Sequence, residues 1–206
     1  MIGTAVLRNL LAALAIWAVA AGAPVRADEI EVTDARLTAG EEGVTLSADF
    51  SFELNPRLAE TVANGVPLYF VVDFELTRPR WYWFDEKAAS KRIQTRLSYH
   101  ALSRHYRLST GVLQQNYASL DEALNVLRRV RGWQVVDRAA VLAEANYEVA
   151  VRMRLDTTLL PKPFQLSAIT NRELNLESSW KRFTFRPPPA PPAPVESREP
   201  RELENR

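Results

Sequence analysis

Alternating apolar and polar side chains in three stretches constrain the fold of this 206-residue chain more than any other feature. In VTLSADFSFEL (44–54) every even position is apolar and every odd position after Val44 is polar or charged. PLYFVVDFELT (67–77) and YEVAVRMRL (147–155) also place an apolar residue at every second position. This period of two is typical of β-strands with one buried face, so we predict an antiparallel sheet. A further strand within 30–39 is expected to pair with 44–54 across GEEG.

Short helices are predicted between the strands. Asn55-Pro56 supplies a cap and a first-turn proline for a helix that Gly65 can end. In SLDEALNVLRRVRG (119–132), Ser119 and Glu122 form a capping box, and Gly132 is expected to end the helix. Its apolar stripe consists of Leu120, Ala123, Leu124, Leu127 and Val130.

The basic residues of that segment are expected in the last helical turn, where cations favour the helix dipole. They are Arg128, Arg129 and Arg131, and contact with an anion or headgroup is the alternative. A third short helix, capped by Asp137, is expected in DRAAVLAEAN. The fold class is therefore mainly β (β-rich α+β), an antiparallel β-sandwich with two or three short helices.

The two ends of the chain differ from this middle. Residues 1–27 have the layout of a secretory signal peptide, with an apolar run from Leu10 to Ala23 and a cleavage site expected after Ala27; a retained anchor is the alternative. Residues 28–186 are expected to form a single β-rich domain. The proline-rich residues 187–206 are expected to be a disordered tail, with recruitment through PxxP spacings as the sharper alternative.

Composition excludes several classes of function. Without the signal peptide the chain has 24 basic and 25 acidic residues, because Arg8 and Arg26 are removed with it. Such a balance argues against nucleic acid as a partner. The chain has no cysteine, so thiolate metal sites and disulfides are excluded. Motifs such as HExxH, GxSxG and GxGxxG are also absent, so we predict no cofactor, no metal and no enzyme activity.

An aromatic run is the first candidate binding site. In PRWYWFDEK the side chains of Trp81, Tyr82, Trp83 and Phe84 would cover both faces of a strand. One interpretation buries both faces; the other is an exposed platform for a sugar ring or protein partner. The flanking Arg78 and Arg80 belong to this candidate.

The only two histidines, His100 and His105, lie in RLSYHALSRHYRLSTG (96–111) and form the second candidate, a polar site. Apolar residues change from odd to even positions within it, which predicts a hairpin with its turn around Leu102-Ser103. His100 would then face His105, whereas a bulge in one long strand would separate them. A metal would need a third ligand, and the neighbouring arginines repel cations, so ordinary surface histidines are favoured.

Two carboxylates, Asp73 and Glu75, share the polar face of one strand. Paired carboxylates can hydrolyse glycosides, so a cell-wall or glycan-active hydrolase is the alternative function. Acidic residues are common on polar strand faces, however, and a structural role is favoured.

Three stretches of the chain carry a resemblance to a known family: LSYHALSRHYRLSTGVLQQNYASLDEALNVLRRVRGW, PLYFVVDFELTRPRWYW and NLESSWKRFTF. Together they resemble a secreted proteobacterial family catalogued as domain of unknown function 4390. The resemblance implies export and carries over no activity, cofactor or catalytic residue. Members are associated with genes for two-component sensor kinases, which hints at envelope sensing. We therefore expect an exported periplasmic protein, a non-enzymatic binding module for an envelope protein or cell-wall component, without a stable membrane span after signal cleavage.

Overall fold

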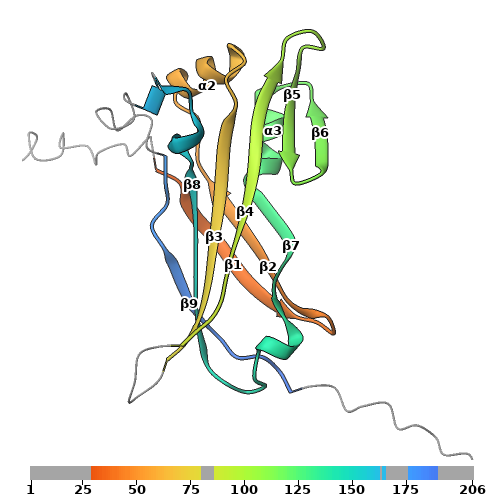
Figure 1. Ribbon diagram of the computed structural model, residues 1–206, viewed down its shortest axis with the longest axis vertical. Coiled ribbons are helices and arrows are strands. Elements are labelled where there is room, and N and C mark those ends of the chain that lie inside the picture. The colour runs from red at the N-terminus through yellow and green to blue at the C-terminus, as the bar shows by residue number, and fades with distance from the viewer. Residues whose placement is uncertain (1–28, 80–85, 163, 166–175, 190–206) are drawn as a thin grey trace, which may run out of the picture.

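The computed structural model describes residues 29–79, 86–162, 164–165 and 176–189, which form two packed antiparallel sheets (Figure 1). The smaller sheet has the order β1-β2-β7, with β1 at Glu31–Ala39, β2 at Gly43–Ser51 and β7 at Arg129–Asp137. The larger has the order β6-β5-β4-β3-β8-β9, with β3 at Leu68–Arg78, β4 at Glu86–His100, β5 at His105–Thr110, β6 at Leu113–Tyr117, β8 at Tyr147–Leu155 and β9 at Lys181–Phe185. The predicted β-rich antiparallel sandwich is confirmed.

The core lies between the sheets, where the predicted alternation places it. Its largest contribution comes from the even positions of β2 and β3 and the odd positions of β8, which are Val44, Leu46, Ala48, Phe50, Leu68, Phe70, Val72, Phe74, Leu76, Tyr147, Val149, Val151, Met153 and Leu155. The Phe52 and Phe70 rings stack at 5.5 Å, and Phe74 meets Trp133 edge-on at 6.4 Å. Phe74 and Trp133 thus connect the two sheets, and Phe52 adds a second aromatic contact from the residue after β2.

The predicted β1–β2 hairpin is confirmed, and its turn needs glycine at position 43. Glu31 pairs with Ser51 and Ala39 with Val44, with GEEG at the turn. Gly43 has φ +152°, and a Cβ there would lie 2.2 Å from the carbonyl oxygen of Val136. Because β7 passes this close, only glycine fits at this position.

Both predicted helix starts are confirmed. Helix α2 covers Pro56–Ala63, and the Asn55 side chain accepts a hydrogen bond from the Leu58 amide at 2.9 Å. Helix α3 covers Leu120–Leu127, and Ser119 Oγ accepts from the Glu122 amide at 3.2 Å. Glu122 accepts in turn from the Ala118 amide at 3.1 Å, one residue before the expected position.

The predicted end of α3 is wrong. The helix stops at Leu127 and Arg128 is its C-cap, so Arg129 and Arg131 lie in strand β7 instead of a last helical turn. Gly132 has φ +60° within β7, where two residues oppose a single residue of β2, so it forms a bulge rather than a helix stop. The helix ends early because β7 pairs with β2, a contact that no local pattern contains.

The expected helix after Asp137 is reduced to one 3₁₀ turn, Arg138–Ala140, and the Asp137 side chain makes no capping hydrogen bond. A second 3₁₀ turn covers Thr157–Leu159. Within the described parts of the chain, no helix combines the length and apolar character needed to cross a bilayer.

Candidate functional site

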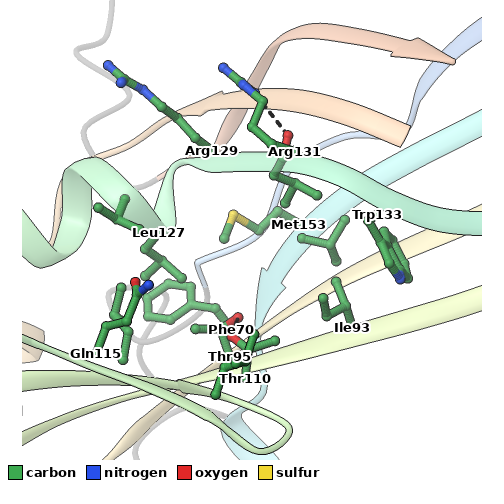
Figure 2. A pocket seen from close by; sticks show the side chains of 15 residues that line it. Phe70, Ile93, Thr95, Thr110, Gln115, Leu127, Arg129, Arg131, Trp133 and Met153 are labelled. Atoms are coloured by element: carbon green, nitrogen blue, oxygen red, sulfur yellow. Dashed lines mark hydrogen bonds between the residues drawn. The ribbon is translucent and has the colours of Figure 1, made fainter. Parts of the chain in front are cut away.

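A groove of about 270 Å³ lies between the two sheets, where β7 diverges from β4 and β5 (Figure 2). Its wall is mostly aliphatic and aromatic and comes from seven elements. The lining residues are Phe70, Val72, Ile93, Thr95, Leu108, Thr110, Leu113, Gln115, Val126, Leu127, Arg129, Val130, Arg131, Trp133 and Met153. An apolar hollow with few polar groups is the usual form of a ligand site.

The groove wall includes five polar residues, which are Thr95, Thr110, Gln115, Arg129 and Arg131. The hydroxyl groups of Thr95 and Thr110 bond each other at 2.8 Å across β4 and β5. Gln115 Oε1 accepts a hydrogen bond from the Tyr117 hydroxyl at 2.6 Å, which leaves the Nε2 donors of Gln115 for another acceptor. Among these side chains, Gln115 has amide donors left for a ligand, next to the apolar part of the wall.

Arg129 and Arg131 border the groove through their backbone and stems. Figure 2 shows both guanidinium groups directed away from the apolar side chains. Arg131 pairs with Asp49 and donates to the Ala48 carbonyl at 3.0 Å, so it ties β7 to β2. Arg128 is also structural, because its Nε donates to the Phe52 carbonyl at 2.9 Å and its guanidinium lies 5.5 Å from the Phe52 ring. The alternative of an anion site at these arginines gains no support from this geometry.

The histidine hairpin is confirmed in the predicted register. His100 pairs with His105, Tyr99 with Tyr106 and Leu97 with Leu108, which excludes the single bulged strand. Both histidines are exposed, and both ring Nδ1 atoms contact Ser103 of the turn. Within the described ranges, no three His, Cys, Asp or Glu side chains gather as metal ligands. The hairpin tip therefore offers turn hydrogen bonds and no assembled site.

A second polar cluster lies on the opposite, outer face of the larger sheet. Asp73 of β3 is 6% exposed and accepts from Arg92 Nε at 2.6 Å and from Arg152 and Arg154 Nε at 3.1 Å each. Arg152 also lies over the Trp180 ring, 4.5 Å from its centroid. We call Asp73, Arg92, Arg152 and Arg154 the outer arginine cluster.

The outer arginine cluster contains Asp73, one of the two carboxylates that the alternative hydrolase function would use. Burial raises the pKa of Asp73, but the hydrogen bonds and charges of Arg92 and Arg154 outweigh it, so the pKa lies below its ordinary value. A carboxyl group that stays ionised cannot donate the proton that a general acid must supply. Glu75 binds Lys87 at 2.8 Å. Both carboxylates are thus engaged by cations of the same sheet.

The aromatic candidate site falls mostly outside the described residues, as Arg80, Trp81, Tyr82, Trp83 and Phe84 all do. Arg78 is described: it ends β3 and pairs with Glu86 at the start of β4. The sequence patterns did not identify the groove, whose residues are spread from 70 to 153.

Searches of curated proteins and of solved structures found no match to this chain. A family model described as domain of unknown function (DUF4390) matches residues 27–184. That range includes every described strand except the last residue of β9, together with the groove and the outer arginine cluster. The chain therefore belongs to the family of domain of unknown function 4390.

Proposed function

We propose that this chain is an exported, non-enzymatic protein of the bacterial cell envelope that binds an acyl chain of an envelope component in its groove. The apolar groove between the sheets is the observation that carries this proposal. Export is supported by the signal-like residues 1–27, and the absence of familiar catalytic motifs favours binding over catalysis.

The chemistry of the groove selects the ligand class. Aliphatic and aromatic walls, with Met153 among them, favour a hydrocarbon chain over a sugar, which would need many hydrogen-bond partners. The Nε2 group of Gln115 supplies one donor, suited to the carbonyl oxygen of a carboxyl or ester group. The volume of about 270 Å³ is just below the ~300–1,000 Å³ of typical ligand pockets, so it suits one short acyl segment rather than a whole lipid.

Titration of the full-length protein with dansyl-labelled undecanoic acid tests this proposal. We expect saturable binding, read from direct excitation of the dansyl group as its emission rises and shifts to the blue. Val126 is 42% exposed at the groove, so Val126→Trp should cover the groove without disturbing the core. We expect at least about tenfold weaker binding, corresponding to ~1.4 kcal/mol.

The matched control is Leu142→Trp, because Leu142 is 56% exposed and does not line the groove. It should leave the affinity for the probe unchanged. Absence of saturable binding by the wild-type protein, or equal affinities of the two tryptophan variants, would contradict the proposal.

A further inference from the structure

Four strands form the edges of the two sheets within the described residues: β1 and β7 in the smaller sheet, β6 and β9 in the larger. An edge strand presents backbone N–H and C=O groups to which another strand can pair. Proteins usually protect such edges with charged residues, prolines or bulges. The composition of each edge therefore indicates whether it is protected from pairing.

Three of these edges are protected. Each of them carries charged side chains, which are Glu31, Asp34 and Arg36 on β1, Arg129, Arg131 and Asp137 on β7, and Lys181 and Arg182 on β9. β1 also has an irregular register between Val32 and Asp34, and β7 has the bulge at Gly132.

Strand β6 has none of these protections: no charged residue, no proline and no bulge. Its sequence LQQNY contains no charge and no proline, and its pairing with β5 is regular. Leu113, its first residue, is 70% exposed, and Val112 in the preceding turn is 96% exposed. Figure 1 shows β6 on the outer side of the larger sheet, beyond β5. We propose that β6 pairs with β6 of a second copy of this chain, antiparallel and about a two-fold axis, so that the two larger sheets become continuous.

The register follows from the β5–β6 hairpin. Gly111 and Val112 form a two-residue loop in which Thr110 pairs with Leu113. Along such a hairpin, residue pairs whose backbones hydrogen-bond each other alternate with pairs whose backbones do not. Thr110 and Leu113 form a hydrogen-bonded pair, so the backbone N–H and C=O groups of Gln114 and Asn116 face away from β5. A two-fold axis at Gln115 sets Gln114 opposite Asn116 of the second copy, which joins these outward groups in hydrogen-bonded pairs.

Self-complementarity selects a second copy as the occupant. On a two-fold axis a residue meets itself, so a charged centre would repel its own copy. The amide of Gln115 both donates and accepts, so it can pair with an identical amide. The same register sets the exposed Leu113 opposite Tyr117 of the second copy, and covers apolar surface at both ends of the strand.

Cross-linking tests the register directly, because the chain has no cysteine. In the full-length protein, Gln115→Cys should oxidise to a covalent dimer, since residues directly opposite each other across strands have the Cα spacing that a disulfide requires. Gln114→Cys is the matched control and should stay uncross-linked, because it faces Asn116 of the second copy. A mixture of Gln114→Cys and Asn116→Cys should form the mixed dimer on a non-reducing gel.

Light scattering on the full-length protein tests the association itself. The wild type should have twice the mass of one chain. Gln115→Lys and Gln115→Glu should each fall to the mass of one chain, and their equimolar mixture should regain the doubled mass. A wild type with the mass of one chain, or cross-linking of Gln114→Cys equal to that of Gln115→Cys, would overturn the proposal. Leu113 and Gln115 also line the groove, but the pairing itself joins backbone groups at the sheet edge. A wild type that forms dimers without binding the acyl probe would contradict the proposed function alone, and a wild type that binds the probe with the mass of one chain would contradict the dimer alone.

Discussion

The two faces of the larger sheet differ in chemistry at the same strand, β3: the inner face is apolar and the outer face is charged. On its inner face, Val72 borders the groove, where apolar walls leave space unfilled. On its outer face, the neighbouring Asp73 is surrounded by three arginines, and every oxygen accepts a hydrogen bond. Polar groups that are fully paired stabilise a fold, whereas unfilled apolar space is available to a ligand. We therefore propose a stabilising role for the outer arginine cluster and a binding role for the groove.

Removal of the central carboxylate is expected to have the largest effect. Asp73→Ala leaves three arginine side chains without their shared partner, and we expect a loss of about 2–3 kcal/mol in the free energy of unfolding. This is less than the loss of a fully buried pair because Arg92 is 61% exposed and can turn into water. Urea denaturation measures it.

The matched control for that variant is Asp34→Ala. Asp34 pairs with Arg36 at 2.8 Å on the surface, with both side chains more than half exposed. Exposed pairs contribute about 0–1 kcal/mol, so little change in the unfolding free energy is expected. Similar losses in the two variants would remove the distinction between the outer arginine cluster and an ordinary surface pair.

An enlarged side chain should distinguish the groove from the closely packed core. Ile93 and Leu97 lie on the same face of β4, but Ile93 lines the groove and Leu97 is 0% exposed and does not line it. Leu97→Phe should cost about 1–3 kcal/mol of unfolding free energy by overpacking, whereas Ile93→Phe should cost less than ~0.5 kcal/mol because the hollow accepts the ring. Thermal denaturation compares the two, and equal costs would mean that the groove is not an unfilled space.

Acidification should have the smallest effect, and the part of it that comes from the outer arginine cluster is the difference between the wild type and Asp73→Asn. Because the pKa of Asp73 is lower in the folded chain than in the unfolded chain, its ionised form adds stability at neutral pH. That contribution is lost as the pH falls through the ordinary pKa of aspartate, about 3.9, towards the lower folded value. The wild type should therefore lose more unfolding free energy than Asp73→Asn between neutral pH and pH ~3. Equal losses, measured by urea denaturation at both pH values, would mean that the arginines do not hold the ionised form.

Much of the fold could be predicted from the sequence because the signals are local. Alternation identified β2, β3 and β8, and the change of phase at Leu102-Ser103 fixed the pairing of His100 with His105. The stretch from Leu120 to Val130 misled the prediction, since an apolar spacing suited to a helix continued into β7. Only the pairing of β7 with β2 decides where α3 ends.

The groove and the outer arginine cluster could not be predicted in the same way. Asp73 and Arg152 are 79 residues apart, and no spacing rule connects them. The groove depends on where side chains fail to fill space, which requires the relative position of two sheets. The histidines attracted attention as rare residues, yet they lie at an exposed hairpin tip with Ser103 as their neighbour.

The strand order of the larger sheet has a consequence for the sequence of folding events. β3, β4, β5 and β6 are neighbours both along the chain and in the sheet, so each pairing closes only a short loop. β8 must join β3 from far along the chain, and it brings Arg152 and Arg154 to Asp73. We therefore expect the outer arginine cluster to be completed late in folding, after the rate-limiting barrier. If so, its interactions slow unfolding, and Asp73→Ala should shorten the lifetime of the native state while the rate of folding changes little.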